Sequence, residues 1–394
     1  MKAIIYPGCV KGSVVVPGSK SLAHRYIICA CLSRGISKID NYDECIDTLA
    51  TLKAFLPFGI KYEINGKSLT IDSSNFHNEE EVVIDCRESA STIRFLIPLL
   101  INYAKKVTFI GSEVLFSRPM DEYIRLFGKN IEIKNNEIIV KNAIDSETIY
   151  IDGSISSQFA TGMIFNQIVK DYPSTIIIQG NIASISYIDL TIQALNQFGA
   201  NVTRDDNVIY VIPSRLTPKT IELEGDYTQA ANFVVLSRIN KSIEILGLNP
   251  ASLQNDKNIY KLLDQDEIDL SNNIDLGPIL FAYAATLAKT TKFINTSRLI
   301  YKESNRVLAM INNLAKFGVV TEVKNNICFI TGKTELITKE ELDSYNDHRI
   351  CMGLAILATI AKGKTVINNA ESINKSYPNF FKDLESLGIK IKLE

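Results

Sequence analysis

One short pattern recurs along this chain at long, regular intervals: a large apolar residue followed by a glycine, where a helix pattern gives way to a strand pattern. The glycines of this pattern are Gly59, Gly128, Gly199, Gly318 and Gly388. Their separations are 69, 71, 119 and 70 residues, so the longest gap accommodates two units, with one turn that lost its glycine near Leu262-Leu263-Asp264. Repeats of this length indicate a supersecondary unit used six times, and they exclude a short-repeat solenoid.

Each unit reads as strand, helix, strand, helix and then two paired strands. In the third unit, residue spacing predicts a helix over 156–165, a strand over 174–179, a helix over 188–198 and a hairpin over 201–212. Glycine adopts the left-handed conformation without strain, so Gly199 is a natural end for the second helix.

A chain of 394 residues exceeds the usual size of one hydrophobic core. We therefore predict an α/β fold of two domains with three units each. The first spans residues 19–224, and the second combines residues 1–18 and 225–394, with two crossing linkers. The segment 1–17 is expected to add a strand to the second domain.

Composition narrows the class of partner. A net charge of -2 provides no field for nucleic acid or an anionic membrane. The seven cysteines are scattered without a CxxC pair and there are three histidines, so we expect reduced thiols and no metal. Neither a signal peptide nor an apolar run of about 20 residues is present. We expect a cytoplasmic protein, and a monomer.

The segment 14–25 reads as a strand, a glycine turn and a helix start rich in hydrogen-bond donors. Lys20 lies at the expected helix N-terminus, and Ser21 and Arg25 share one face. An ammonium, a hydroxyl and a guanidinium fork suit phosphate and carboxylate groups. The spacing is not that of a Walker A loop. Taken alone, the segment is equally compatible with a capped surface helix.

Other segments are similar in kind. Residues 153–158 collect hydroxyls and an amide at a helix start, where serine often serves only as a cap. Lys302 and Arg306 lie one turn apart around Glu303, as in an ordinary charged helix face, and Asp275 precedes an apolar helix, as a cap does. Residues 345–349 crowd charges before another apolar helix.

The cations among these segments fall at comparable places in the repeats. They are Lys20, Arg25, Arg118, Lys302, Arg306, Arg349 and Lys375. Converging cations are stable only opposite strong anions, which predicts substrates with phosphate or carboxylate groups. Asp275 and Glu303 are the carboxylates that remain to move protons.

Together these motifs resemble the EPSP synthase (3-phosphoshikimate 1-carboxyvinyltransferase) family of enolpyruvyl transferases, from one end of the chain to the other. The matching segments are 17–21, 152–159, 187–189, 224–226, 302–306 and 345–349. The resemblance implies two inside-out α/β barrels, each of three βαβαββ units, with substrates in the cleft between them. It also implies transfer of the enolpyruvyl group of phosphoenolpyruvate to the 5-hydroxyl of shikimate 3-phosphate, with release of phosphate and without metal or organic cofactor.

Roles follow from the resemblance position by position. It implies that shikimate 3-phosphate is bound by Lys20, Ser21, Arg25, Ser156, Ser157, Gln158, Ser184, Tyr187, Asp275 and Lys302. It implies that phosphoenolpyruvate is bound by Lys20, Ala90, Arg118, Gln158, Arg306, Arg349 and Lys375. Asp275 would take the 5-hydroxyl proton. Glu303, assisted by Lys20 or His348, would serve proton transfer at the methylene carbon.

Three positions depart from the family pattern. Glu88 and Ala90 stand where members often have asparagine and glycine, and Arg298 stands where many have an asparagine that touches shikimate 3-phosphate. An extra methyl group in a filled pocket costs about 1–3 kcal/mol. We therefore expect Ala90 to weaken the binding of glyphosate, the family's phosphonate inhibitor, more than it weakens the binding of phosphoenolpyruvate.

Two alternatives stay open at this stage. UDP-N-acetylglucosamine enolpyruvyl transferases share the fold and the donor, but they have Lys-Asn where this chain has Lys20-Ser21. They also commonly carry a catalytic cysteine in the loop that matches residues 111–119, which has none here. The other alternative is a repeat-built binding protein without turnover, which would lack the acid and base that Asp275 and Glu303 provide.

Overall fold

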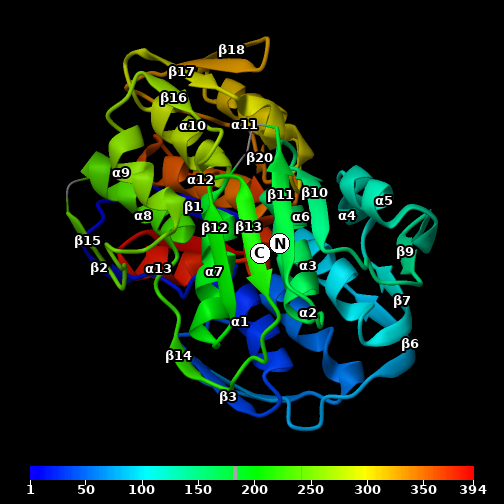
Figure 1. The fold of residues 1–394 in the computed structure, drawn as a ribbon. Coiled ribbons are helices and arrows are strands. Elements are labelled where there is room, and N and C mark those ends of the chain that lie inside the picture. Colours follow the sequence, from blue (N-terminus) through cyan, green and yellow to red (C-terminus); the bar gives the residue numbers. More distant parts are fainter. Residues whose placement is uncertain (181–183, 241) are drawn as a thin grey trace. The chain divides into compact units, whose positions relative to one another are not determined.

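The computed structural model describes residues 1–180, 184–240 and 242–394. It divides into two compact units. The terminal unit comprises Met1–Pro17 and Glu224–Glu394, and the central unit comprises Gly18–Leu223. Each unit has its own buried apolar core. Figure 1 gives the course of the chain in sequence colours.

The described part of the central unit forms three four-stranded sheets, with the strand orders β14-β3-β5-β4, β6-β7-β9-β8 and β10-β11-β13-β12. Their strands are β3 (Ile36–Asp40), β4 (Lys61–Asn65), β5 (Ser68–Asp72), β6 (Glu79–Asp85), β7 (Ala104–Ile110), β8 (Ile131–Lys134), β9 (Glu137–Val140), β10 (Thr148–Asp152), β11 (Ser174–Gln179), β12 (Asn201–Asp205), β13 (Val208–Ile212) and β14 (Thr220–Glu222). The helices are α1 (Lys20–Leu32), α2 (Ile46–Lys53), α3 (Ala90–Leu100), α4 (Glu113–Phe116), α5 (Asp121–Phe127), α6 (Ser157–Ile168) and α7 (Ser186–Gln197). Short 3-10 turns are η1 (Leu56–Phe58) and η2 (Gly128–Asn130).

The described part of the terminal unit forms two four-stranded sheets, β20-β21-β1-β22 and β16-β17-β19-β18, and one two-stranded sheet, β15-β2. Their strands are β1 (Lys2–Tyr6), β2 (Gly12–Val15), β15 (Ile243–Leu246), β16 (Glu267–Asp269), β17 (Thr290–Ile294), β18 (Val320–Lys324), β19 (Ile327–Thr331), β20 (Leu342–Asp343), β21 (Thr365–Asn368) and β22 (Lys390–Leu393). The helices are α8 (Tyr227–Asn240), α9 (Ile259–Leu262), α10 (Gly277–Ala285), α11 (Arg306–Lys316), α12 (His348–Ile360) and α13 (Phe380–Ser386). The 3-10 helices are η3 (Asn255–Asn258), η4 (Ile274–Leu276), η5 (Thr296–Tyr301) and η6 (Ala370–Lys375).

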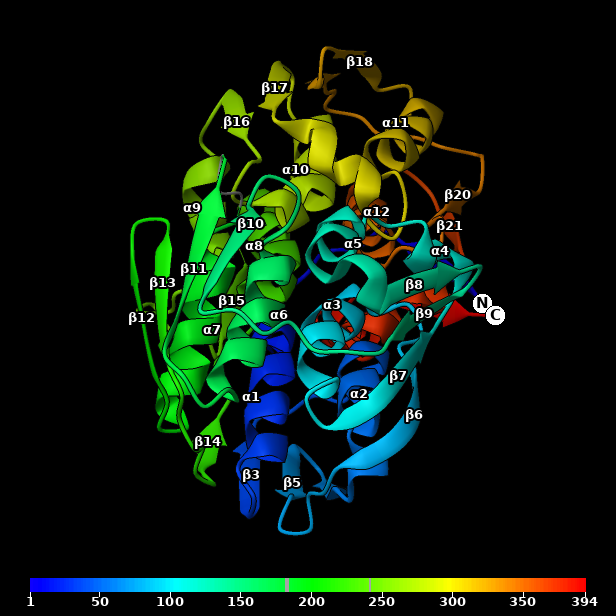
Figure 2. The same cartoon turned by 45° about the vertical axis from the view of Figure 1, so that its right-hand side comes forward.

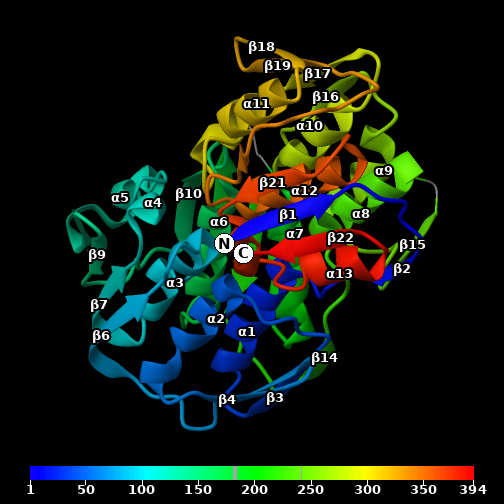
Figure 3. The same ribbon diagram turned by 180° about the vertical axis from the view of Figure 1, so that it is seen from behind.

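All the four-stranded sheets share one pattern of strand pairing. The first two strands in each order pair in parallel, and the other pairs are antiparallel. In the sheets that begin with β6, β10, β16 and β20, helical structure joins the two parallel strands, as a crossover connection requires, whereas β14 pairs with β3 from the far end of the central unit's sequence. The predicted strand-helix-strand-helix-hairpin unit is therefore confirmed. The N-terminal strand β1 lies between β21 and β22, as expected for segment 1–17, and Figure 3 shows it in blue beside red β22.

The glycines of the recurring turn all have positive φ, from 51° at Gly128 to 101° at Gly388. At the turn that lost its glycine, α9 ends at Leu262, and Leu263 keeps the ordinary right-handed φ of -65°. The expected hairpin is not found there, which corrects the prediction of six complete units. Only residues 263–266 separate α9 from β16, too few for two strands.

The helices, and not the sheets, occupy the middle of each unit. In α12 every residue but Ile360 is buried, whereas β4 alternates exposed and half-buried residues. Helix α3 packs against α6, and β6 to β9 lie on its outer side in Figure 2. Gly162 makes the helix contact possible, because a Cβ there would stand 2.3 Å from the carbonyl oxygen of Arg94. This is the inside-out arrangement that the resemblance implied.

No helix in the described ranges is long and apolar enough to cross a membrane. All seven cysteines are free thiols, and Cys9 is the exposed one.

Candidate active-site residues

In four of the four-stranded sheets, the first strand in the order ends at an aspartate, and the chain turns there. These strands end at Asp85, Asp152, Asp269 and Asp343. The Oδ1 atom of each accepts the backbone N–H two residues further on, at 2.8, 2.8, 2.8 and 2.7 Å. Such Asx turns fix the direction in which the next helix starts. The residues six positions after these aspartates are Ser91, Gln158, Asp275 and Arg349.

A second recurring position is the residue that directly follows the second strand in each four-stranded sheet order. It holds Asn41, Gly111, Gly180, Asn295 or Asn369, and all of these but Gly111 have a left-handed φ. The residues six or seven positions further are Asp47, Arg118, Tyr187, Lys302 and Lys375. The repeat thus supplies two recurring positions, which explains why four of the predicted cations, Arg118, Lys302, Arg349 and Lys375, fall at comparable places.

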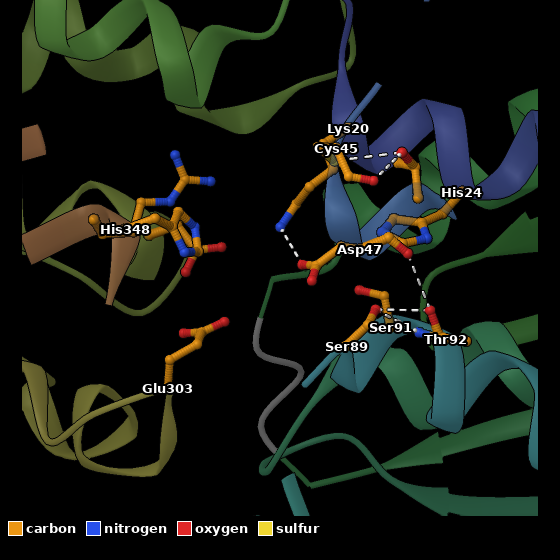
Figure 4. Close-up of polar contacts among 12 residues, drawn as sticks. Lys20, His24, Cys45, Asp47, Ser89, Ser91, Thr92, Glu303 and His348 are labelled. Carbon is orange, nitrogen blue, oxygen red and sulfur yellow. Dashed lines mark hydrogen bonds and ion pairs between the residues drawn. The ribbon is translucent and has the colours of Figure 1, made fainter. Parts of the chain in front are cut away.

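In the central unit, Lys20 is the first residue of α1, and Ser19 caps that helix. The Nζ atom of Lys20 lies 2.9 Å from Oδ2 of Asp47, and the two side chains are 15% and 10% exposed. Figure 4 shows the Lys20 side chain directed at Asp47. Asp47 was missed in the sequence because it forms a contact 27 residues away, beyond any local pattern.

Hydroxyl groups connect the helices α1, α2 and α3 near Lys20. His24 Nδ1 bonds to Thr51 Oγ1 at 2.7 Å, and Thr51 bonds to Thr92 Oγ1 at 2.7 Å. Thr92 in turn donates to Ser89 Oγ, and Ser89 caps α3 ahead of Ala90. Burial, with the nearby charges of Lys20 and Arg25, holds the pKa of His24 well below its usual value, so this histidine is neutral.

Gln158 is held from two sides. Its Oε1 accepts from Arg94 Nη1 at 2.9 Å, and its Nε2 donates to Ser91 Oγ at 3.0 Å. Arg94 also donates to the carbonyl of Pro119, next to Arg118, which is buried. Arg94 was missed as well, although an arginine within the apolar helix α3 was an available signal.

Arg25 is buried against residues that were predicted to share its ligand. Its guanidinium donates to the carbonyls of Ser21 and Tyr187, at 2.6 and 2.8 Å, and to Thr191 Oγ1 at 2.8 Å. Burial lowers the pKa of Arg25 to about 10. Ser184 is buried with a φ of 59°, and its carbonyl accepts the N–H of Tyr187.

Ser156 and Ser157 begin α6. Ser156 is its N-cap and accepts the N–H of Gln158 at 3.3 Å, while Ser157 is its first residue and is buried. Ser156 therefore performs the capping role that the sequence left open.

In the terminal unit, three carboxylates surround Arg306, which is 1% exposed. It donates to Asp275 at 2.8 Å, to Glu303 at 2.6 Å and to Asp347 at 2.8 Å. Although burial opposes its charge, Asp347, Glu303 and Asp275 together raise the pKa of Arg306 above its usual value. Its predicted contact with phosphoenolpyruvate stays a prediction, since its donors here serve carboxylates.

Lys302 reaches the same Asp275 oxygen at 3.0 Å. Burial lowers the pKa of Lys302 to about 8. Burial alone would raise the pKa of Asp275, but the charges of Lys302, Arg306 and Arg349 hold it well below its usual value. Asp275 is therefore an ionised carboxylate that can accept a proton once those charges are offset.

Asp347 is completely buried and organises the start of α12. Its Oδ1 accepts the N–H of Arg349 at 2.9 Å, and His348 lies beside it with Nδ1 at 4.0 Å. In the part of the chain that the structure describes, Nε and Nη1 of the buried Arg349 have no hydrogen-bond partner. Buried donors of this kind require an acceptor, such as water or a ligand anion. Lys375 is also buried, and its Nζ donates to the carbonyl of Asn346.

Asp256 is a further buried carboxyl that no sequence motif singled out. It accepts from Thr228 Oγ1 and from Asn273 Nδ2, two residues before Asp275. Burial, with a smaller contribution from Asp275, raises its pKa to about 6. Within the described ranges, no group of three or more His, Cys, Asp or Glu side chains is arranged to hold a metal ion.

The structure thus gathers the predicted residues into two groups, one in each unit. Those of the central unit are Lys20, Ser21, Arg25, Ala90, Arg118, Ser156, Ser157, Gln158, Ser184 and Tyr187. Those of the terminal unit are Asp275, Lys302, Glu303, Arg306, His348, Arg349 and Lys375. Arg298, also in the terminal unit, donates from Nη1 to the carbonyl of Ser271 at 2.9 Å.

Comparison with known proteins gives one consistent result. The family model described as EPSP synthase (3-phosphoshikimate 1-carboxyvinyltransferase) matches residues 6–265 and 259–384. A 3-phosphoshikimate 1-carboxyvinyltransferase of Clostridium perfringens is 34% identical, and the match covers 100% of both chains. That of Clostridium acetobutylicum is 36% identical over 98% of this chain and 96% of its own.

Solved structures agree on the fold. EPSP synthase from Acinetobacter baumannii superposes with a TM-score of 0.80 at 21% identity, covering 100% of both chains. The enolpyruvyl transferase NikO from Streptomyces tendae superposes with a TM-score of 0.77 at 14% identity, over 99% of this chain and 98% of its own. Because the family model matches residues 6–384 and the relatives match 98–100% of the chain, the chain belongs to the EPSP synthase (3-phosphoshikimate 1-carboxyvinyltransferase) family.

Proposed function

We propose that this chain is a 3-phosphoshikimate 1-carboxyvinyltransferase. It transfers the enolpyruvyl group of phosphoenolpyruvate to the 5-hydroxyl of shikimate 3-phosphate and releases phosphate, a step of the shikimate pathway. The observation that carries the proposal, beside family membership, is the ionised Asp275 held between Lys302 and Arg306 with Glu303 on the same arginine. That group combines a proton acceptor with the cations that an anionic substrate would neutralise.

The addition step forms one C–O bond and moves two protons. Asp275 takes the proton of the 5-hydroxyl group while the hydroxyl oxygen attacks C2 of phosphoenolpyruvate. Glu303 delivers a proton to the methylene carbon C3. In the elimination, Glu303 takes a proton back from C3, the bond between C2 and the phosphate oxygen breaks, and Asp275 passes its proton to the departing phosphate. Phosphate leaves and the enol ether remains, so atoms and charges balance.

The cations set when Asp275 can act as a base. In the ligand-free structure Lys302, Arg306 and Arg349 keep its pKa low, which makes it a weak base. Substrate phosphate and carboxylate groups would offset those charges and raise that pKa toward the working pH, where general bases are most efficient. Proton acceptance is thereby coupled to substrate binding.

The anion-binding roles rest on buried donors. Arg349 has two guanidinium nitrogens that require acceptors, and Lys20 lies at the start of α1, where the helix dipole also favours an anion. We assign both to phosphoenolpyruvate, with Arg118 and Lys375. We assign Ser21, Arg25, Ser156, Ser157, Gln158, Ser184, Tyr187, Asp275 and Lys302 to shikimate 3-phosphate, and Lys20 to both substrates.

The test is phosphate release from phosphoenolpyruvate by the purified chain with each candidate acceptor. We expect release with shikimate 3-phosphate and none with UDP-N-acetylglucosamine, and we expect the Lys20→Ala variant to be inactive. Release with the UDP-sugar alone, or none with either acceptor, would refute the proposed function. Near-normal release by the Lys20→Ala variant would remove that residue from the mechanism.

A further inference from the structure

Two aspartates of the terminal unit do more than close an Asx turn. Asp343 Oδ1 accepts the N–H of Tyr345 at 2.7 Å and also Nδ2 of Asn369 at 2.9 Å. Asp269 Oδ1 accepts the N–H of Ser271 at 2.8 Å and also Nδ2 of Asn295 at 2.8 Å. In both pairs the partners are 26 residues apart. We call these pairs, Asp343–Asn369 and Asp269–Asn295, the two latches.

Each latch joins two segments that carry predicted site residues. Asp343 begins the turn to Arg349, and Asn369 precedes η6, which ends at Lys375. The same two segments meet again where Lys375 Nζ donates to the carbonyl of Asn346. The latch and this second bond close a ring that holds Arg349 and Lys375 in one arrangement.

The other latch is built in the same way. Asp269 begins the turn to Asp275, and Asn295 precedes η5 and Lys302. Here the second bond is donated by Arg298, whose Nη1 reaches the carbonyl of Ser271 at 2.9 Å. This ring fixes Asp275 relative to Lys302, the pair whose Oδ1–Nζ distance is 3.0 Å.

The central unit shows that the fold does not need the amide. Asp152 forms the same Asx turn, but Gly180 occupies the position of the latch asparagine. A Cβ at Gly180 would lie 3.5 Å from Asp152 Oδ1, so the geometry is the same and only the side chain is missing. Gly111 likewise follows β7 in the sheet whose first strand, β6, ends at Asp85.

Left-handed φ alone does not explain the asparagines. Asn295 and Asn369 have φ of 59° and 55°, values that glycine adopts at least as well. Asn325, in the hairpin between β18 and β19, has a φ of 52° and lies outside both latches. What distinguishes the latch asparagines is the bond from their amide to an aspartate at a functional turn.

We propose that Asn369 and Asn295 are positioning residues for the transferase reaction, acting through Asp343 and Asp269. The Asp343–Asn369 latch sets the spacing of Arg349 and Lys375 and so affects the binding of phosphoenolpyruvate. The Asp269–Asn295 latch sets the spacing of Asp275 and Lys302 and so affects turnover. The inference rests on the proposed function.

The first test replaces each asparagine by glycine, which keeps the left-handed backbone and removes the amide. For Asn369→Gly we expect the KM for phosphoenolpyruvate to rise about tenfold, the equivalent of about one hydrogen bond. Its kcat and its KM for shikimate 3-phosphate should stay within about twofold. For Asn295→Gly we expect kcat to fall about tenfold while the KM for phosphoenolpyruvate stays within about twofold.

Asn325→Gly is the matched control, because it makes the same change at a left-handed position outside the latches. It should leave all three kinetic constants at wild-type values. A rescue pair completes the design. Asn369→Asp places a carboxylate against Asp343 and should raise the KM for phosphoenolpyruvate further. Adding Asp343→Asn restores one donor and one acceptor, and it should return that KM most of the way to wild type.

Wild-type KM for phosphoenolpyruvate in Asn369→Gly overturns the inference. So does a parallel change in all constants together with a lowered Tm, because that pattern marks a structural role alone. Failure of the double variant to recover relative to Asn369→Asp overturns it too. All of these comparisons require that the wild-type protein releases phosphate with shikimate 3-phosphate. If the wild-type protein does not, the proposed function fails, and that failure is distinguishable from a failure of the inference.

Discussion

The two groups of site residues differ in what their buried cations contact. In the central unit, Arg25 donates to carbonyl and hydroxyl oxygens, and Arg94 donates to an amide and a carbonyl. In the terminal unit, one arginine, Arg306, meets three carboxylates. Neutral partners leave a cation's charge largely unbalanced, whereas carboxylates offset it, and the cations in turn lower the pKa of Asp275.

The difference indicates a division of labour. Unbalanced cations suit the binding of a phosphorylated acceptor, and ionised carboxylates beside cations suit proton transfer. Members of both groups occupy the same repeat positions, as Gln158 and Asp275 do, so the residue type at such a position, and not the backbone, separates binding from proton transfer. Four predictions test that separation, from the largest expected effect to the smallest.

The largest effect is expected for Asp275→Asn. The amide cannot accept the 5-hydroxyl proton, so kcat should fall by roughly 10²- to 10⁴-fold. Steady-state phosphate release at saturating substrates measures it. The Asn272→Ala variant, at a neighbouring position that the resemblance does not assign, serves as the control. A kcat within about threefold of wild type for Asp275→Asn would exclude it as the base.

Asp347→Asn should chiefly affect stability. Removing the charge takes one ionic partner from the buried Arg306 and weakens the cap of α12. Breaking a buried ion pair lowers the free energy of unfolding by about 3–5 kcal/mol. Urea unfolding followed by circular dichroism measures the loss. Asp47→Asn in the central unit, where the pair with Lys20 is partly exposed, should cost clearly less, and equal costs would contradict the contrast between the units.

Asp256 predicts a pH dependence of stability. Its folded pKa of about 6 exceeds its ordinary value, so its contribution to stability is complete below pH about 4 and is lost as pH rises through 6. Asp256→Asn removes that loss. Its stability relative to wild type should therefore increase between pH 4.5 and 7.5, by on the order of 2 kcal/mol. Urea midpoints at the two pH values test it, and an unchanged or decreasing difference would contradict the raised pKa.

The smallest effect is expected for Ala90→Gly. Ala90 is the first residue of α3 and is buried, so its methyl group takes up space at the helix start. Glycine should lower the inhibition constant for glyphosate while changing the KM for phosphoenolpyruvate less. Inhibition kinetics of the wild type and the Ala90→Gly variant measure the inhibition constant for glyphosate. Equal inhibition constants would refute the steric interpretation.

Much of the fold could be predicted from sequence because its markers are local. The turn glycines, such as Gly199 and Gly318, lie where a helix ends, and the apolar spacing on either side needs no distant contact to be recognised. The degenerate unit was mispredicted because the missing hairpin leaves no positive signal. The sequence near Leu262 resembles a helix end whether or not two strands follow.

Site residues could be predicted from the sequence only where they belong to a short motif with several charged or polar residues. Lys20, Glu303 and Arg349 lie in such motifs, but Asp47 and Arg94 act through partners 27 and 64 residues away. The turn aspartates are a signal that could have been used. Each ends a strand of the structure six residues before Ser91, Gln158, Asp275 or Arg349, yet an aspartate at a strand end is ordinarily only a turn former.

The most direct test of the division between the units compares Lys20→Met with Asp275→Asn by titration calorimetry with shikimate 3-phosphate, alongside kcat. We predict that Lys20→Met weakens binding of shikimate 3-phosphate, while Asp275→Asn binds it nearly as the wild type does and yet fails to turn over. Normal binding by Lys20→Met together with lost binding by Asp275→Asn would contradict the assignment of acceptor binding to the central group and of proton transfer to the terminal group.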